Sequence, residues 1–298
     1  MNTHRLLRRL ALPLAALALH AMDAQAQAAA PAEPLSLQVY NAAAGSFHAN
    51  AVLVTGKTDA VLLDTGFTRA DAMRIAAMVL DSGKTLKTIV ITQADPDFYF
   101  GIGVLKHAFP QAHVVTAAPL LKKIEATLPT KLQVWGPRLG ANAPAAVPLP
   151  EALAKPVVEL EGQTLEVRGL DDGIAGRSYV WIPSLRTVAG GAGVFAGLHV
   201  WTADTQSVAE RAAWQRQLAA MTALQPLRVI PGHSRAGAAQ DVSALRWTQD
   251  YLARFETELP KAANSAALIG AMQKAYPDAG LGIALDIGAK VNKGEMKW

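Results

Sequence analysis

The chain has 298 residues, no cysteine and a formal net charge of +4 at pH 7. The absence of cysteine excludes disulfides, thiolate metal ligands and a cysteine nucleophile, so His, Asp and Glu are the candidate metal ligands. The charge is modest, and beyond the first nine residues no basic run is longer than Lys122-Lys123. We therefore expect a small-molecule ligand or substrate rather than nucleic acid or a membrane surface.

The first 26 residues contain the three parts of a secretory signal peptide in order. Three arginines occur among the first nine residues, an apolar run follows at 10–19, and Ala24-Gln25-Ala26 is a small-residue cleavage site. The apolar run is too short for a membrane anchor, and no later stretch reaches the ~18 apolar residues that a span needs. We expect 1–26 to be removed, 27–298 to form a single domain, and the mature protein to be periplasmic or secreted. An uncleaved membrane tether is the alternative.

Hydrophobic periodicity predicts alternating groups of strands and helices along the rest of the chain. In chain order we expect strands at 35–40, 51–55 and 60–63, a helix at 68–80, a strand at 88–92, a helix at 98–109, a strand at 113–116, a helix at 119–128, strands at 164–168, 178–182 and 186–189, a helix at 206–224, a strand at 227–230, and helices at 242–259 and 263–276. The Pro- and Gly-rich segment 129–156 is expected to be an ordered loop. It either covers an active site, with Trp135 and Leu139 facing the substrate, or packs on the domain.

The corner after the strand 88–92 carries the most informative residues, TQADPDFYFG at 92–101. Corners at the carboxyl ends of strands are common ligand sites in α/β proteins. The segment resembles the metal-binding turn of the metallo-β-lactamase superfamily, T-H-x-H-x-D-H-x-x-G. The matching residues are Thr92, Asp97 and Gly101, whereas Gln93, Asp95 and Phe98 stand at the three histidine positions. Asp95 and Asp97 are also typical of a helix start, where they would act only as caps.

Four further motifs resemble the same superfamily in the same order. They are DTG at 64–66, GLDD at 169–172, GGAGVF at 190–195 and PGH at 231–233. The resemblance covers roughly 35–259 and implies a four-layer αββα sandwich of the metallo-β-lactamase type with a helical C-terminal part. It also implies that Asp64 orients the metal-binding turn by hydrogen bonding, although Asp64 could equally cap the next helix.

The resemblance places further residues at metal-ligand positions. Asp171 falls where relatives have the histidine of a G-H-T turn, with Asp172 as a rival if the alignment slips by one residue. Ala192 falls at the metal-bridging Asp, and His233 is a ligand histidine still in place. The nearby His199 and Asp204 also resemble residues of the hydrolase-like branch, but a single histidine here is more often a hydrogen-bonded structural residue.

An intact site of this superfamily holds one or two zinc or iron ions that activate water for hydrolysis. Because Phe98 and Ala192 cannot coordinate, we do not expect a dinuclear zinc centre. One hypothesis is a single divalent ion, Mn²⁺, Mg²⁺ or Zn²⁺, held by Asp95, Asp97, Asp171 and His233, with Asp97 as the catalytic residue. Such an exported hydrolase would act on an ester, lactone or amide. The alternative is a metal-free, non-catalytic relative that binds a small molecule or protein partner in the old cleft.

Overall fold

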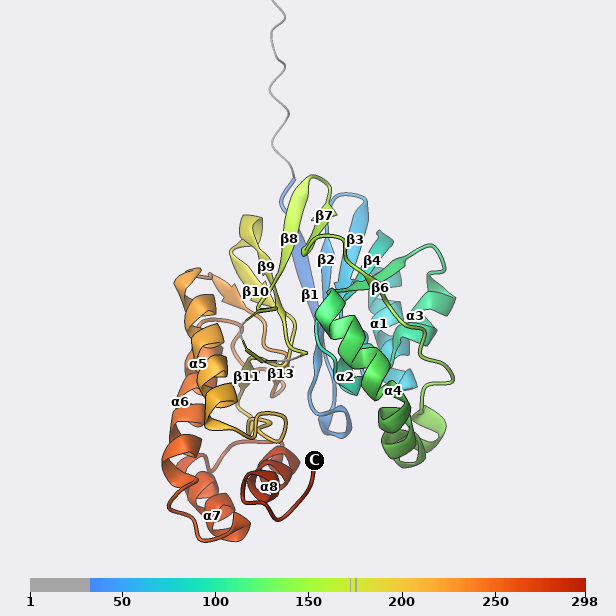
Figure 1. Cartoon of the computed structure of the whole chain (residues 1–298). Coiled ribbons are helices and arrows are strands. Elements are labelled where there is room, and N and C mark those ends of the chain that lie inside the picture. Colours follow the sequence, from blue (N-terminus) through green and yellow to red (C-terminus); the bar gives the residue numbers. More distant parts are fainter. Residues whose placement is uncertain (1–32, 172, 175) are drawn as a thin grey trace, which may run out of the picture. The chain divides into compact units, whose positions relative to one another are not determined.

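The computed structural model describes residues 33–171, 173–174 and 176–298 (Figure 1). The expected signal peptide and Asp172 lie outside the described residues. Within the described part, all residues belong to one compact unit. In that part of the chain, no helix is both long and apolar enough to cross a membrane.

The elements follow the predicted order closely. The first half contains β1 (Ser36–Asn41), β2 (Asn50–Thr55), β3 (Asp59–Leu63), α1 (Arg69–Asp81), β4 (Thr85–Ile91), α2 (Pro96–Tyr99), α3 (Ile102–Ala108), β5 (His113–Thr116), α4 (Ala118–Leu139) and β6 (Glu151–Ala152). The second half contains β7 (Val157–Leu160), β8 (Gln163–Arg168), β9 (Tyr179–Ile182), β10 (Thr187–Ala189), β11 (Phe195–Ala196), α5 (Val208–Ala223), β12 (Arg228–Val229), β13 (His233–Ser234), α6 (Ser243–Glu258), α7 (Ser265–Ala275) and α8 (Gly282–Asn292).

Two sheets make the centre of the fold. One has the strand order β1-β2-β3-β4-β5-β6, antiparallel from β1 to β3 and parallel from β3 to β6. The other has the order β12-β10-β9-β8-β7, and β11 pairs with β13 beside it. Alternate residues of both sheets, such as Val54, Val61, Val167 and Val180, share one buried cluster. The two sheets therefore pack face to face.

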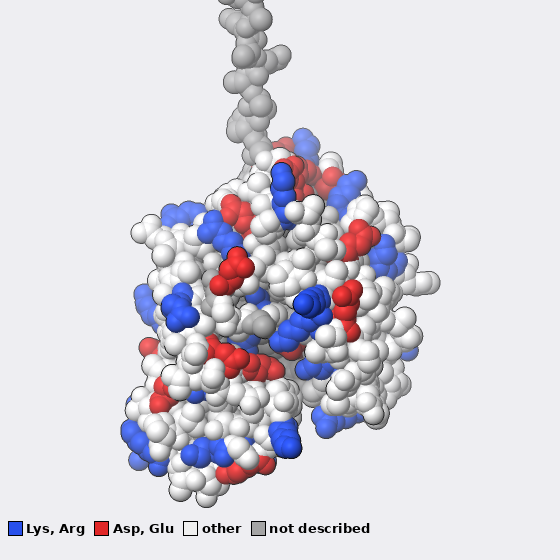
Figure 2. Space-filling model, viewed as in Figure 1, with Lys and Arg blue, Asp and Glu red and all other residues white. Residues whose placement is uncertain are grey.

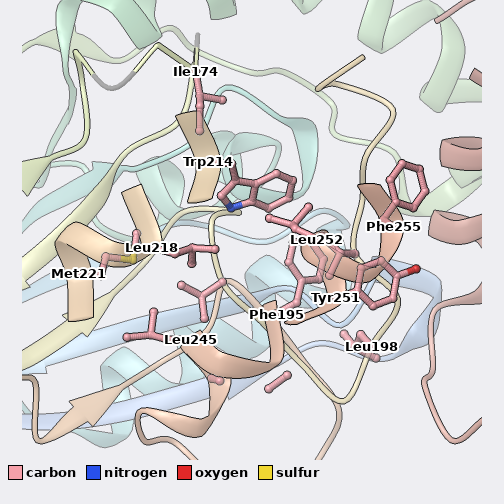
Figure 3. Close-up of a cluster of buried hydrophobic side chains, with 14 of the residues drawn as sticks. Ile174, Phe195, Leu198, Trp214, Leu218, Met221, Leu245, Tyr251, Leu252 and Phe255 are labelled. Atoms are coloured by element: carbon pink, nitrogen blue, oxygen red, sulfur yellow. The ribbon is translucent and has the colours of Figure 1, made fainter. Parts of the chain in front are cut away.

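Helices cover the outer face of each sheet (Figure 1). The opposite residues of β2, β3 and β4 pack with α1, α3 and α4 in one buried cluster. The outer side of the second sheet packs against α5 and α6 around Trp214, Tyr251 and Phe255 (Figure 3). This order of helix, sheet, sheet and helix confirms the predicted αββα sandwich.

The predicted helix 98–109 is interrupted after α2. The carbonyl of Phe98 accepts a hydrogen bond from the backbone N–H of Thr65 at 2.8 Å instead of continuing the helix. At Gly101 an added Cβ would lie 2.0 Å from the carbonyl oxygen of Thr65, so only glycine permits this close approach. The turn of the predicted site is thereby fixed against the loop after β3.

The predicted loop 129–156 was wrong over its first third, because α4 continues to Leu139 through Pro129 and Pro137. Four apolar residues at helical spacing hold this extension on the core: Leu128, Leu132, Trp135 and Leu139. Packing of this stripe outweighs the missing backbone donors of the prolines. The strands β6, β7, β11 and β13 and the helix α8 were not predicted.

Candidate functional site

A pocket lies at the carboxyl end of β4, with about 540 Å³ of empty volume that includes solvent at its mouth. Its walls come from the turn into α2, from α4, from the segments before β9 and after β10, from β11 and β13, and from the C-terminal residues. Its lining residues are Phe47, Phe67, Asp95, Pro96, Asp97, Lys131, Trp135, Arg177, Ala192, Phe195, Trp201, Asp204, His233, Leu281 and Trp298.

Asp64 holds the turn that follows β4. Its carboxylate accepts hydrogen bonds from the backbone N–H of Thr92 at 2.8 Å and from the Thr92 hydroxyl at 2.6 Å. The Thr92 hydroxyl oxygen in turn accepts from the backbone N–H of Gly191 at 2.7 Å. The helix α1 is capped by Thr68 rather than by Asp64. The contacts of Asp64 therefore match its expected role in orienting the turn and do not match the alternative role as a helix cap.

Gln93 and Asp95, at the first two histidine positions of the motif, are hydrogen-bonded to each other. The Gln93 Nε2 amide donates to Asp95 Oδ2 at 2.6 Å, and Lys131 Nζ lies 3.9 Å from Asp95 Oδ1. The Asp95 side chain makes no capping hydrogen bond, although the residue occupies the N-cap position of α2. Gln93 Oε1 is buried and has no partner among the described residues. The carboxylate of Asp95 is thus already paired within the protein.

Asp97 and His233 are brought together, with 3.5 Å between Asp97 Oδ2 and His233 Nε2. Nδ1 of His233 lies 2.9 Å from the carbonyl oxygen of Phe47, so Nδ1 carries the proton and Nε2 faces Asp97. Burial lowers the pKa of His233 to about 4. Burial, and next the nearby Asp95, raises the pKa of Asp97 well above its usual range. Both effects favour neutral forms of this pair.

Aromatic rings occupy the sides of His233. Phe195 stacks on its imidazole at 4.8 Å, and Phe98 meets it edge-on at 5.3 Å between ring centroids. Phe98, at a histidine position of the motif, therefore packs against the remaining ligand histidine instead of coordinating beside it.

Arg177 is a buried, charged pocket residue that the sequence analysis missed. Gly176-Arg177-Ser178 is hydrogen-bonded to the turn after β4, through Ala94 N to Gly176 O at 3.1 Å and Ser178 N to Thr92 O at 3.2 Å. This pairing sets Arg177 opposite Gln93. The side chain is 3% exposed, and its guanidinium carbon lies 4.0 Å from the ring centre of Trp214. Among the described residues, Arg177 Nη1 has no hydrogen-bond partner. Burial lowers the pKa of Arg177.

Asp171 is not brought to this pocket. It is exposed and lines a separate hollow with Gly173, Arg216 and Ala220. Its rival, Asp172, lies outside the described residues. The segment that pairs with the metal-like turn is Gly176-Arg177-Ser178, directly before β9. Like the G-H-T turn, this segment has a glycine followed two residues later by a hydroxyl residue, directly before a strand. That spacing was the signal that could have identified Arg177.

The two further residues of the GLHVWTADT segment have different surroundings. His199 is buried and its Nδ1 lies 3.0 Å from the hydroxyl of Tyr251, which is the structural role expected of it. Asp204 lines the pocket and accepts a hydrogen bond from Trp298 Nε1 at 2.7 Å. Burial, and next the nearby Asp95, raises the pKa of Asp204.

The donor set does not fit the metal ions of related sites. The side chains of Phe98 and Ala192 contain only carbon and cannot coordinate at two of the ligand positions. Next to a third ligand position, that of Gln93, lies Arg177, whose guanidinium is a cation and has no lone pair to offer a metal ion. Across residues 33–171, 173–174 and 176–298, no three His, Asp or Glu side chains come together in a group that could hold a metal ion. The predicted ligand set of Asp95, Asp97, Asp171 and His233 is therefore incomplete, since only Asp95, Asp97 and His233 line the pocket.

An αββα sandwich whose pocket lies at the turn after β4 defines a protein of the metallo-β-lactamase class. The family model of the metallo-beta-lactamase superfamily matches residues 44–233, and the chain belongs to this superfamily. No curated protein matches the sequence.

Solved structures share the fold at low sequence identity. A metallo-beta-lactamase family protein of Thermus thermophilus is 16% identical and has a TM-score of 0.59, covering 88% of this chain and 92% of its own. The metallo-beta-lactamase from Pontibacter korlensis is 17% identical with a TM-score of 0.50, covering 74% of this chain and 95% of its own. VMB-1 is 18% identical with a TM-score of 0.51, covering 75% of this chain and 94% of its own.

Proposed function

We propose that this protein is a metal-independent, non-catalytic relative of the metallo-β-lactamase-fold hydrolases that binds a small molecule in the pocket described above. One observation carries the proposal: the backbone of Arg177 pairs with that of Gln93, and its buried side chain lines the pocket in which relatives gather ligands around a metal ion. A divalent cation next to a buried guanidinium would be repelled with little solvent screening. The same charge attracts an anionic ligand instead.

The remaining polar groups of the pocket support this proposal. Asp95 is paired with Gln93 and Lys131, and the shifted pKa values of Asp97 and His233 favour their neutral forms. Most other lining residues are aromatic or aliphatic. A concave, largely apolar pocket with a few polar groups is typical of small-molecule sites. The face shown in Figure 2 carries interspersed acidic and basic side chains, and it is hollowed near its middle.

Metal analysis combined with thermal melting tests the proposal. Protein purified without chelator or affinity nickel should contain no stoichiometric Mn, Mg, Zn or Fe, and its melting temperature should not rise with Mn²⁺, Mg²⁺ or Zn²⁺. An ion that binds only the folded state at a hundredfold excess over its Kd would add about 2.7 kcal/mol of stability.

A matched pair of variants separates the two hypotheses. If the pocket holds a divalent ion, Asp95→Asn removes a ligand and should abolish the ion-dependent rise in melting temperature, whereas the exposed Asp171→Asn should retain it. That pattern would favour the hydrolase acting on an ester, lactone or amide. Two zinc ions per chain retained through dialysis would contradict the proposal outright.

A further inference from the structure

Arg177 is a buried cation that forms no salt bridge within the described part of the chain, although Asp204, Asp95 and Glu210 attract its charge from a longer distance. Its side chain is 3% exposed and lines the pocket, yet Nη1 has no hydrogen-bond partner among the described residues. Trp214 packs against the guanidinium at 4.0 Å, which leaves the pocket side to other groups. Burying a charge without hydrogen bonds to all of its donors lowers the stability of the fold. An anion that enters the pocket would relieve this cost.

The carboxylates that share the pocket already have other partners. Asp95 accepts from Gln93 at 2.6 Å, Asp204 accepts from Trp298 at 2.7 Å, and Asp97 faces His233 at 3.5 Å. None of them accepts a hydrogen bond from Arg177 among the described contacts, although Asp204 and Asp95 attract its charge. The carboxylate of Asp95 adds negative charge to the pocket, which disfavours a dianion such as a phosphate monoester and leaves a monoanion as the better match.

Aromatic rings build the opposite part of the wall. Phe47, Phe67 and Trp135 contact one another with ring centroids 5.3 to 5.4 Å apart, and Trp201 lies 5.9 Å from Phe47. These four rings come from three distant parts of the chain and all line the pocket. A flat apolar group fits such a wall better than a polar one.

We propose that the pocket binds a small monocarboxylate with a flat, apolar body, whose carboxylate pairs with Arg177 and whose body packs against Phe47, Phe67, Trp135 and Trp201. This assignment rests on the proposed metal-free function and names the ligand class of the same pocket. A planar guanidinium is well matched to a carboxylate, since it offers parallel N–H donors.

Calorimetric titration with benzoate tests the ligand class, with benzamide as the neutral analogue, acetate as the analogue without a ring, and phenyl phosphate as the dianion. The wild-type protein should bind benzoate more tightly than all three. Hydrogen bonds to a charged group are worth enough to make Arg177→Met bind benzoate about 10–100-fold more weakly. Its affinity for benzamide should stay within about twofold of the wild-type value, because methionine preserves much of the apolar stem.

Two further variants make the result specific. Arg138→Met is the control for a lost arginine, because Arg138 is exposed and lies 5.0 Å from the ring of Trp135 without lining the pocket. It should bind benzoate as the wild type does. Trp135→Leu should weaken benzoate and leave acetate unchanged, since only benzoate uses the aromatic wall. If Arg177→Met does not fold, the preference of the wild type for benzoate over benzamide decides the question.

Three results would overturn the inference: benzoate binding equal to benzamide binding, benzoate binding unaffected in a folded Arg177→Met variant, or no benzoate binding at millimolar concentration. Titration after treatment with EDTA separates this inference from the proposed function. Binding that requires a metal ion would disprove the metal-free function. Binding that survives EDTA but ignores Arg177 would disprove only the ligand class.

Discussion

Asp64 shows how one buried carboxylate fixes the pocket. It is 1% exposed, and both of its oxygens accept hydrogen bonds from Thr92, the first residue of the turn. Its backbone φ of 64° lies in the left-handed region, which aspartate tolerates better than most residues. Burial raises its pKa to about 7, against the hydrogen bonds from Thr92 that favour the charged form.

This shift predicts a pH dependence of stability. The unfolded Asp64 has a pKa near 3.9, so between about pH 4 and pH 7 the folded state holds a proton that the unfolded state has lost. The contribution is complete below about pH 4 and disappears as pH rises through about 7, with an upper limit of about 4 kcal/mol. Asp64→Asn is neutral at every pH, so its free energy of unfolding should fall less between pH 4 and pH 7 than that of the wild type.

Urea denaturation across this pH range measures the difference. The exposed Asp171→Asn should keep the wild-type pH dependence and serves as the control. Parallel pH curves for Asp64→Asn and the wild type would show that Asp64 is ionised throughout.

The motif residues were predictable one by one, because each lies within a short segment with its own pattern. Asp95, Asp97, Ala192 and His233 all line the pocket as their motifs implied. Arg177 was not predictable in this way. Its position depends on the pairing of Gly176-Arg177-Ser178 with a turn more than eighty residues earlier. A shift of six residues along the chain exchanges Asp171 for Arg177 in that pairing.

At the scale of elements, Glu161 joins two hairpins from different sheets. It lies in the turn between β7 and β8. Its carboxylate accepts from the backbone N–H groups of Lys57 and Thr58 in the turn between β2 and β3, both at 2.7 Å, and of Asp59 at the start of β3, at 2.9 Å. An added Cβ on Gly56 would lie 2.5 Å from Glu161 Oε2, so a side chain there would displace the Glu161 carboxylate from its donors. Backbone hydrogen bonds, from Thr58 first, lower the pKa of Glu161 to about 2.

Glu161→Gln should therefore lower the melting temperature at pH 7, because a carboxamide presents an N–H group to one of these donors. The lowered pKa of the folded state means that the stabilising effect is complete above about pH 4.5 and is lost as pH falls through about 2. The gap in melting temperature between wild type and variant should accordingly shrink towards pH 2. Glu159→Gln, an exposed change on the neighbouring β7, is the control. An equal gap at all pH values would contradict the assignment.

The helix α4 illustrates where element prediction from sequence failed. The Pro- and Gly-rich composition of 129–156 indicated an ordered loop rather than a helix, since proline lacks a backbone donor. The apolar spacing of Leu128, Leu132, Trp135 and Leu139 carried the opposite signal, and burial of that stripe decided the outcome. Of the two residues expected to face a substrate, Trp135 lines the pocket and Leu139 packs against the core.

At the scale of the whole molecule, the layers were predictable because five motifs in a fixed order define the superfamily fold. The C-terminal helix α8 was not, since no motif covers it and Leu281, which precedes it, has a positive φ of 59°. Its docking depends on contacts with distant segments, such as the hydrogen bond from Asn292 Nδ2 to the carbonyl of Thr202 at 3.2 Å. Such contacts leave no local pattern in the sequence.

Export remains a proposal that concerns the whole chain. The basic, apolar and small-residue parts of the first 26 residues predict cleavage, so the mature protein should begin near Gln27 or Ala29. Intact-mass analysis of protein from the periplasm or the medium measures this directly. A cytoplasmic product with the full-length mass would contradict it.

Arg211 ties the C-terminal helices to the rest of the molecule. It projects from α5, is 2% exposed, and pairs with Glu256 on α6. Its Nη1 donates to the carbonyl of Thr205 at 2.8 Å and to Asn292 Oδ1 on α8 at 2.7 Å. A single guanidinium thus connects α5, α6, α8 and the loop that leads to the pocket residue Asp204.

Arg211→Met removes the donor of the Thr205 carbonyl and of Asn292 Oδ1 and breaks the pair with Glu256, whose side chain is 34% exposed. The variant should therefore lower the free energy of unfolding by about 2 kcal/mol. Arg216→Met, an exposed change on the same helix, should alter it by no more than about 0.5 kcal/mol. Urea denaturation of both variants checks the difference, and hydrogen exchange should show the largest loss of protection in α8, which depends on Arg211 through Asn292. Equal stability of the two variants, or a loss of protection that spares α8, would mean that apolar packing alone holds these helices in place.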